Sequence, residues 1–145
     1  MGYTHYWHID EDLKEFPEEA INLIKDLVDD ELIDQSDIDI TNSFINFNGV
    51  GENAHENCFI KLPTKRQSYL LNDHKGKFFG FCKTARKPYD VIVMRVLLVL
   101  KFYLKDKMVI SSDGSFNIEW RISIDEVSRL CGKTIYVEER LELGE

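Results

Sequence analysis

The sequence predicts an α+β fold: a mixed or antiparallel sheet packed around one long buried helix, with an amphipathic acidic helix and a short C-terminal helix. Two patterns support this class. Aromatic, β-prone segments occur at residues 3–9 and 77–82, and an apolar run at 88–105 is too long for a strand. The chain has 145 residues, of which 43% are hydrophobic. A chain of this size fits one core, so residues 1–145 are expected to form a single domain.

The segment YTHYWHI at residues 3–9 predicts an N-terminal strand. A period of two places Tyr3, His5, Trp7 and Ile9 on one face and the residues between them on the other. Because both faces carry aromatic side chains, we expect the strand to be buried on both sides. His5 and His8 then lie on opposite faces, so they do not share a metal ion.

Residues 17–33 predict a helix. Pro17 suits its first position, and Glu18 and Glu19 suit its positive end. An apolar stripe recurs at helical spacing through Ala20, Ile21, Ile24, Leu27, Val28 and Leu32. The opposite face is acidic, and we expect it to be solvated.

Short strands and turns are expected in the middle of the chain. One or two strands lie within residues 38–47, followed by a turn at Asn48-Gly49, a loop at 51–57 and a strand at 58–62. Residues 63–76 have an irregular pattern. The alternation at 77–82 predicts another strand, in which Gly80 indicates that something packs closely against the backbone.

Residues 88–105 predict the central buried helix. Pro88 can open it, Lys101 and Lys105 suit its negative end, and the run is apolar nearly all round.

A hairpin is expected next, with strands at 108–112 and 116–121 joined by Asp113-Gly114. A capping box formed by Ser123 and Glu126 then predicts a short helix that stops at Gly132. A short strand at 134–137 and a frayed acidic tail complete the prediction.

Composition excludes several classes of protein. Three widely spaced cysteines without a Cys-x-x-Cys pair argue against a disulfide framework and a cysteine-rich zinc site. The first residues lack the basic start and apolar stretch of a signal peptide, and no apolar run reaches the roughly 20 residues that span a bilayer. We therefore expect a cytoplasmic protein with no membrane span, no metal ion and no cofactor.

Charge is distributed unevenly along the chain. The formal net charge is -8. Residues 1–60 carry a net -13, residues 61–110 a net +9 and residues 111–145 a net -4. The acidic total disfavours non-specific binding to nucleic acid, whereas the basic middle indicates a local anion site. Alternatively, the basic segment only neutralises the acidic helix in the folded chain.

The run FGFCKTARKPYD at residues 79–90 carries the strongest functional signal, because it leads from a predicted strand into the start of the central helix. A helix N-terminus attracts phosphate or carboxylate through its unpaired N–H groups and its dipole. Lys83, Arg86 and Lys87 would meet the negative groups, and Thr84 would add a hydroxyl donor. A planar base would stack on aromatic side chains drawn from Tyr6, Trp7, Phe81 and Tyr89.

Each of these features also has a purely structural interpretation. The lysines could be ordinary surface residues and the aromatic rings core, and no phosphate-binding loop or Gly-x-Gly-x-x-Gly motif is present. Cys82 fits a buried structural cysteine better than a nucleophile. His5 could equally be a hydrogen-bonded core histidine, and His55-Glu56 a solvated loop.

The start MGYTHYW, the run FCKTARKPYD and the later SSDG resemble an uncharacterised family of small proteins from bacteria and their phages. The resemblance covers nearly the whole chain and implies a microbial or phage intracellular protein, without implying a reaction. It marks ten candidate site positions: His5, Tyr6, Trp7, Lys83, Thr84, Arg86, Lys87, Tyr89, Asp90 and Asp113.

Three functions are compatible with these observations. The first is binding of a small anionic, nucleotide-like ligand between the first strand and the central helix. In a phage, such a protein would be a sponge that sequesters a nucleotide immune signal, an anti-defence role. The second is a small hydrolase or phosphoesterase that uses His5 or His55-Glu56 as acid–base groups. The third is a protein-interaction module whose acidic first helix contacts a basic partner.

Overall fold

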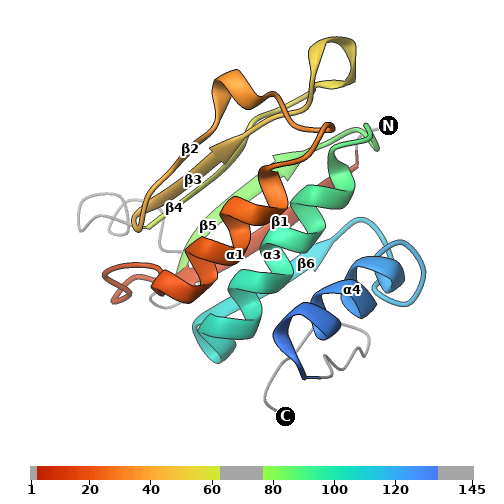
Figure 1. Ribbon diagram of the computed structural model, residues 1–145. Helices are drawn as coiled ribbons and strands as arrows, with labels where there is room; N and C mark the ends of the chain where they lie inside the picture. Colours follow the sequence, from red (N-terminus) through yellow and green to blue (C-terminus); the bar gives the residue numbers. More distant parts are fainter. Residues whose placement is uncertain (1–2, 63–76, 134–145) are drawn as a thin grey trace.

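Two antiparallel sheets and three helices form an α+β fold in the computed structural model, which describes residues 3–62 and 77–133 (Figure 1). The first sheet has the order β5-β1-β6, and the second has the order β2-β3-β4. The strands are β1 Thr4–Asp10, β2 Asp39–Ile40, β3 Phe44–Phe47, β4 Cys58–Lys61, β5 Lys77–Lys83 and β6 Met108–Ser112. The helices are α1 Glu18–Val28, α3 Asp90–Leu104 and α4 Arg121–Cys131, and short 3-10 turns occupy Gln35–Asp37, Gly51–Asn53 and Lys105–Lys107.

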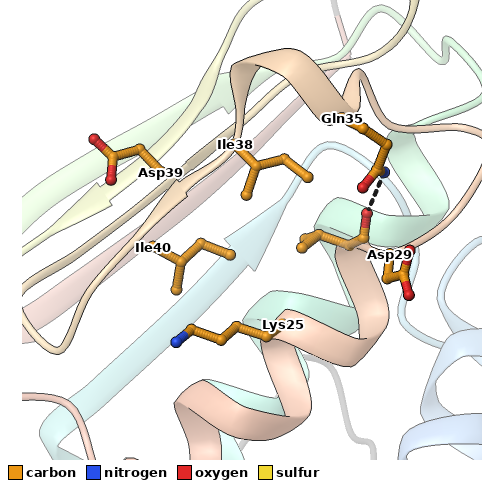
Figure 2. A pocket seen from close by; sticks show the side chains of 7 residues that line it. Lys25, Asp29, Gln35, Ile38, Asp39 and Ile40 are labelled. Carbon is orange, nitrogen blue, oxygen red and sulfur yellow. Dashed lines mark hydrogen bonds between the residues drawn. The ribbon is translucent and has the colours of Figure 1, made fainter.

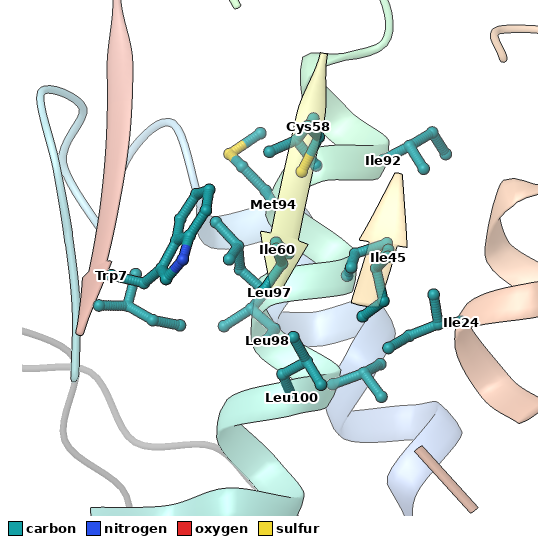
Figure 3. Packing of buried hydrophobic residues seen from close by; sticks show 14 of the residues in the cluster. Trp7, Ile24, Ile45, Cys58, Ile60, Ile92, Met94, Leu97, Leu98 and Leu100 are labelled. Carbon is teal, nitrogen blue, oxygen red and sulfur yellow. The ribbon is translucent and has the colours of Figure 1, made fainter. Parts of the chain in front are cut away.

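Helix α3 is the centre of the core, as the apolar run predicts. Ten of its 15 residues are buried, which places apolar side chains on every side of the helix. Helices α1 and α4 flank it and the first sheet lies behind it (Figure 1). Trp7 of β1, Ile60 of β4 and Ile24 of α1 surround its leucines (Figure 3). Both sheets therefore share one hydrophobic core through α3.

Strand β1 is buried on one face only, so the expectation of burial on both sides was wrong. Tyr3, His5, Trp7 and Ile9 are at most 3% exposed and face the helices, whereas Tyr6 and His8 on the other face are only half-buried. β1 is the middle strand, paired with β5 and with β6. Aromatic side chains on both faces indicate burial only when helices cover both faces, and here the described helices cover one.

Gly80 of β5 makes the close approach that its place in the strand predicts. It pairs with Trp7 of β1. A Cβ atom at position 80 would overlap the indole nitrogen and ring carbons of Trp7. The Trp7 ring therefore lies flat against the β5 backbone, and the glycine is the residue that leaves room for it.

The C-terminal hairpin was predicted wrongly. Residues 108–112 form β6, but its antiparallel partner is β1 rather than residues 116–121. Asp113 explains this choice, because its backbone N–H donates to the Thr4 carbonyl and its carboxylate accepts from the Thr4 N–H. These bonds fasten the end of β6 to the start of β1. Residues 115–120 form turns that lead into α4.

Two helix boundaries also differ from the prediction. Helix α1 ends at Val28, because the Asp30 carboxylate accepts the Leu32 N–H in a turn and Ile33 pairs with Gly49 in an isolated bridge. Helix α4 begins at Arg121, so Ser123 lies inside it and forms no capping box. Its expected end is confirmed, since Gly132 follows the last turn with a φ of 72°.

The remaining strands lie where the sequence predicts them. Residues 38–47 form the β2–β3 hairpin, and residues 58–61 form β4. Asn48-Gly49 opens a longer loop, in which the Asn48 side chain bonds the Gly49 N–H and the backbone of His55. The predictions for 63–76 and 134–137, and that of the acidic tail, lie outside the described residues.

We predict that Gly80→Ala destabilises the fold by about 1–3 kcal/mol, because the new methyl group forces the Trp7 ring out of its packed position. Urea unfolding followed by tryptophan fluorescence measures this change. Ser111→Ala, at an exposed position of β6 in the same sheet, is the matched control and should leave the free energy of unfolding within about 0.5 kcal/mol of the parent. Equal stability of the two variants would show that the sheet accommodates the methyl group without cost.

Candidate functional site

Three segments that are far apart in the sequence meet at one end of the first sheet, where β1 begins, β5 and β6 end and α3 starts. The Thr84 N–H donates to the Tyr3 carbonyl at 3.0 Å, which joins the end of β5 to β1. The Tyr6 hydroxyl donates to Asp113 Oδ1 at 3.1 Å, which joins β1 to the end of β6. These segments are the ones that carry the family resemblance, so the fold gathers them into one corner.

His5 is the buried hub of this corner. Its ring is 0% exposed, and its two nitrogens contact two different elements. Nε2 lies 2.6 Å from Asp90 Oδ1 at the first turn of α3, and Nδ1 lies 2.8 Å from Ser112 Oγ at the end of β6. Thr84 also donates its hydroxyl to Asp90 Oδ1, at 2.6 Å. One imidazole therefore ties together β1, β6 and α3.

The donor and the acceptor of each hydrogen bond in this network can be assigned from the chemistry of the side chains. A carboxylate only accepts, so Nε2 carries the proton that His5 donates to Asp90. In the neutral ring Nδ1 is then an acceptor, and Ser112 donates its hydroxyl proton to it. The Ser112 oxygen in turn accepts the Gly114 N–H at 2.9 Å. Ser112, His5 and Asp90 thus have the order of nucleophile, base and orienting acid, although the first two are buried or half-buried.

The turn between β5 and α3 is strained. Ala85 and Arg86 have φ values of 53° and 58°, and the Lys87 N–H closes the turn on the Thr84 carbonyl at 3.0 Å. Two positive φ values at the centre of a turn favour Gly, Asn or Asp, whereas a side chain such as alanine or arginine costs about 1–2 kcal/mol there. Strain of this kind collects at functional sites, where the surroundings hold it in place.

Arg86 belongs to this turn and is exposed to solvent. Its side chain is 61% exposed, its guanidinium lies 4.0 Å from the centre of the Tyr3 ring, and its nearest described carboxylate is Glu119 at 3.8 Å. Burial, followed by the carboxylates of Asp90 and Glu119, raises the pKa of Tyr3 to about 12, and Arg86 opposes this rise. The Tyr3 side chain therefore stays uncharged, and its ring orients Arg86 through a cation–π contact.

The two lysines of the candidate site lie outside the buried network. Lys83 is exposed, and its Nζ lies 5.9 Å from the centre of the Phe81 ring. Its backbone N–H donates to the Glu56 carboxylate at 3.1 Å, so an acid lies on one side of it. Lys87 is half-buried beside Arg86. The three cations therefore lie at the surface, whereas the space between the first strand and the start of the central helix, where a ligand was expected, holds the side chains of His5, Thr84 and Asp90.

Four of the expected ligand contacts are buried and therefore wrong, and two of them, His5 and Thr84, are 0% exposed members of the internal network. Trp7 is 1% exposed and packs in the core, and Tyr89 is 0% exposed, with its hydroxyl donating to the Glu56 carbonyl at 2.6 Å. Neither ring can stack on a ligand. Trp7 faces the helical core because successive residues of a strand alternate between its two faces. Tyr89 also faces the core, since the start of α3 directs it inward.

Other candidates are also placed by the structure. Cys82 is buried, with its thiol directed at the Glu56 carbonyl at 3.6 Å, so it lies away from solvent. Cys58 is buried beside it, and burial raises the pKa of that thiol well above its usual value. His55 is exposed in the loop before β4 and lies outside the His5 network. Ser112 was not predicted as a partner of His5. The two-residue alternation of a strand could have placed Ser112 on the same face as the buried Met108 and Ile110.

An open cavity of about 340 Å³ lies elsewhere, between α1 and β2 (Figure 2). Lys25 and Asp29 line it from the helix, and Ile38 and Ile40 line it from the strand. Gln35 lies at its edge and donates to the Val28 carbonyl at 2.8 Å. Its walls mix apolar groups with both signs of charge, so they select no ligand chemistry.

No family model matches the chain, and neither a curated protein nor a solved structure matches it. The family resemblance therefore remains a prediction. Within residues 3–62 and 77–133, no cluster of three or more metal-ligating side chains occurs. No helix in the same ranges is long and apolar enough to cross a bilayer.

We predict that Ala85→Gly stabilises the protein by up to about 1 kcal/mol, because glycine adopts a positive φ without strain and this gain exceeds the added entropy of the unfolded chain. Ala54, with a φ of -82°, is the matched control, and Ala54→Gly should destabilise by about 1 kcal/mol. Thermal unfolding of the two variants measures both changes. Destabilisation of the same size at position 85 would mean that the turn carries no strain.

Proposed function

We propose that this protein binds a small anionic, nucleotide-like ligand at the corner where β5 meets α3. Lys83, Arg86 and Lys87 contact its phosphate groups. The observation that carries the proposal is the strained turn, because it holds Arg86 in solvent against the Tyr3 ring at a cost in backbone energy. An ordinary surface arginine requires no such conformation.

The electrostatics of the corner favour a phosphate-bearing ligand over a neutral one. Among residues 3–62 and 77–133, Arg86 is the one of the three cationic side chains that pairs with a carboxylate, and the 3.8 Å distance to Glu119 is longer than a good charged hydrogen bond. The Glu119 carboxylate is already occupied by the Ser115 N–H at 2.7 Å, which lowers the pKa of Glu119. A phosphate can therefore replace Glu119 at Arg86 without leaving that carboxylate unpaired.

The rigid network beneath the turn suits binding. His5 and Thr84 are fully buried and both bond Asp90, so the start of α3 and the end of β5 cannot separate easily. A preorganised surface loses little entropy when a ligand arrives. If the source is a phage, such a protein fits a sponge that sequesters a nucleotide immune signal in the host cytoplasm, a role that needs tight binding and no turnover.

We predict that Arg86→Ala weakens binding of AMP or a cyclic dinucleotide by about 1.5–3 kcal/mol, the range for a hydrogen bond to a charged group. Isothermal titration calorimetry measures the affinity. Arg121→Ala is the matched control, since Arg121 is 44% exposed and pairs with Asp125 on α4. A thermal-shift screen of nucleotides, cyclic dinucleotides and sugar phosphates selects the probe, because a ligand at 100 times its dissociation constant stabilises by about 2.7 kcal/mol. Equal affinities for the two variants would remove Arg86 from the site.

Hydrolysis of such a ligand is a second candidate function, and the Ser112–His5–Asp90 order favours it. His5 Nδ1 lies 2.8 Å from Ser112 Oγ, within reach for proton transfer. Against it, His5 is 0% exposed, and the Ser112 hydroxyl is already held by His5 and by the Gly114 N–H. Binding without turnover therefore has the stronger support.

We predict that ligand recovered after incubation with the protein is chemically intact, as mass spectrometry of the heat-released ligand would show. Ser112→Ala should then leave affinity unchanged while lowering the melting temperature, because His5 Nδ1 loses its partner. Conversion of the ligand by the parent protein, lost in Ser112→Ala at unchanged affinity, would establish the hydrolase instead.

A further inference from the structure

The outer face of the first sheet carries a row of aromatic side chains on the side away from helices α1, α3 and α4. We name Tyr6, His8, Phe79 and Phe81 the outer aromatic face. Tyr6 is paired with Phe81, and His8 with Phe79, across the β1–β5 ladder. Phe79 is 37% exposed and Phe81 is 44% exposed. Large rings that stay exposed on a sheet lose the stabilisation that burial would give. Patches of such rings mark sites of interaction.

Neighbouring rings of this face contact one another at interplanar angles from 21° to 45°. The Tyr6 and Phe79 centroids are 6.2 Å apart with an interplanar angle of 21°, and those of Phe79 and Phe81 are 5.9 Å apart at 32°. His8 packs against Phe79 at 4.9 Å. The Tyr6 hydroxyl bond to Asp113 fixes one end of the row. The result is a contiguous row of exposed and half-buried rings on one face of the sheet.

Positive charge borders the row at one end. Lys83 follows Phe81 on the same face of β5, with Nζ 5.9 Å from the centre of that ring, and Arg86 and Lys87 follow in the strained turn. Stacking rings beside cations are the two features with which proteins bind single-stranded nucleic acid, since every base has a π-face and every linkage a phosphate. An apolar protein partner would use the rings but not the adjacent cations.

We infer that the outer aromatic face stacks the bases of a short single-stranded oligonucleotide whose phosphates contact Lys83 and Arg86. The inference rests on the proposed function, and it replaces the buried Trp7 and Tyr89 with exposed rings. The net charge of -8 limits the ligand to a few nucleotides, because a long polyanion would be repelled by the acidic remainder of the chain.

The chain provides a matched control for this face. Phe59 of β4 is 47% exposed, and Lys61 lies 5.8 Å from the centre of its ring, as Lys83 does from Phe81. Phe59 belongs to the second sheet and its ring neighbour is Phe44, so it is an exposed phenylalanine beside a lysine without the row of rings. Phe81→Leu and Phe59→Leu therefore change the same chemistry on two different sheets.

The experiment is fluorescence anisotropy with labelled RNA tetranucleotides, together with calorimetry of AMP, on the full chain. We expect the tetranucleotide to bind more tightly than AMP. Phe81→Leu should weaken the tetranucleotide about tenfold, the size of one lost base stack, while Phe59→Leu leaves its affinity unchanged. Melting temperatures confirm that both variants fold.

The other outcomes separate the two proposals. Arg86-dependent binding of AMP that is as tight as that of the tetranucleotide, with no effect of Phe81→Leu, overturns the inference and leaves the proposed function standing. Tetranucleotide binding that depends on Phe81 but is unchanged in Arg86→Ala overturns the phosphate contact at Arg86, in the proposed function and in the inference alike, and supports only the stacking on the aromatic face. A dimer in the parent protein that becomes a monomer in Phe81→Leu, without oligonucleotide binding, shows that a second copy of the chain covers the face and overturns the inference.

Discussion

The contact between His5 and Asp90 is the interaction on which the corner depends. It joins the middle strand of the first sheet to the first turn of the buried helix, at 2.6 Å and with the ring fully buried. A buried polar group without a partner costs about 1–3 kcal/mol, so the imidazole demands a bond at each nitrogen. Asp90 and Ser112 supply them and thereby set the positions of α3 and of the end of β6. The strained turn and its arginine are built on this base.

Much of the fold could be predicted from local patterns. The buried helix, the acidic helix, β4, β5 and the close approach at Gly80 all follow from apolar runs, end signals or alternation within a few residues. The errors arise where a distant strand competes with a local partner. Asp113-Gly114 is a strong hairpin signal, yet Asp113 exchanges two hydrogen bonds with Thr4 because β1 is the longer partner with a buried face. Ser123 misled for a related reason, since helix α4 starts earlier where Trp120 packs against His5.

The candidate site divides in the same way. The cationic turn could be predicted because Lys83, Arg86 and Lys87 are neighbours in sequence. Which aromatic rings face solvent could not, because that depends on which face of β1 and β5 the helices cover. Trp7 and Phe79 have similar local surroundings in the sequence, but one is at the core and the other is in water. The strain at Ala85 and Arg86 has no sequence signal either, since neither residue is typical of a left-handed turn.

The central place of β1 also has a consequence for how the chain matures. Its two neighbours are residues 77–83 and 108–112, so β1 cannot form these pairings until at least 67 further residues have been made. Pairings over such long sequence separations fold slowly. In that interval Tyr3, Trp7 and Ile9 remain available to chaperones or to other nascent chains. Translation speed over the segment before β6 therefore bears directly on the yield of folded protein.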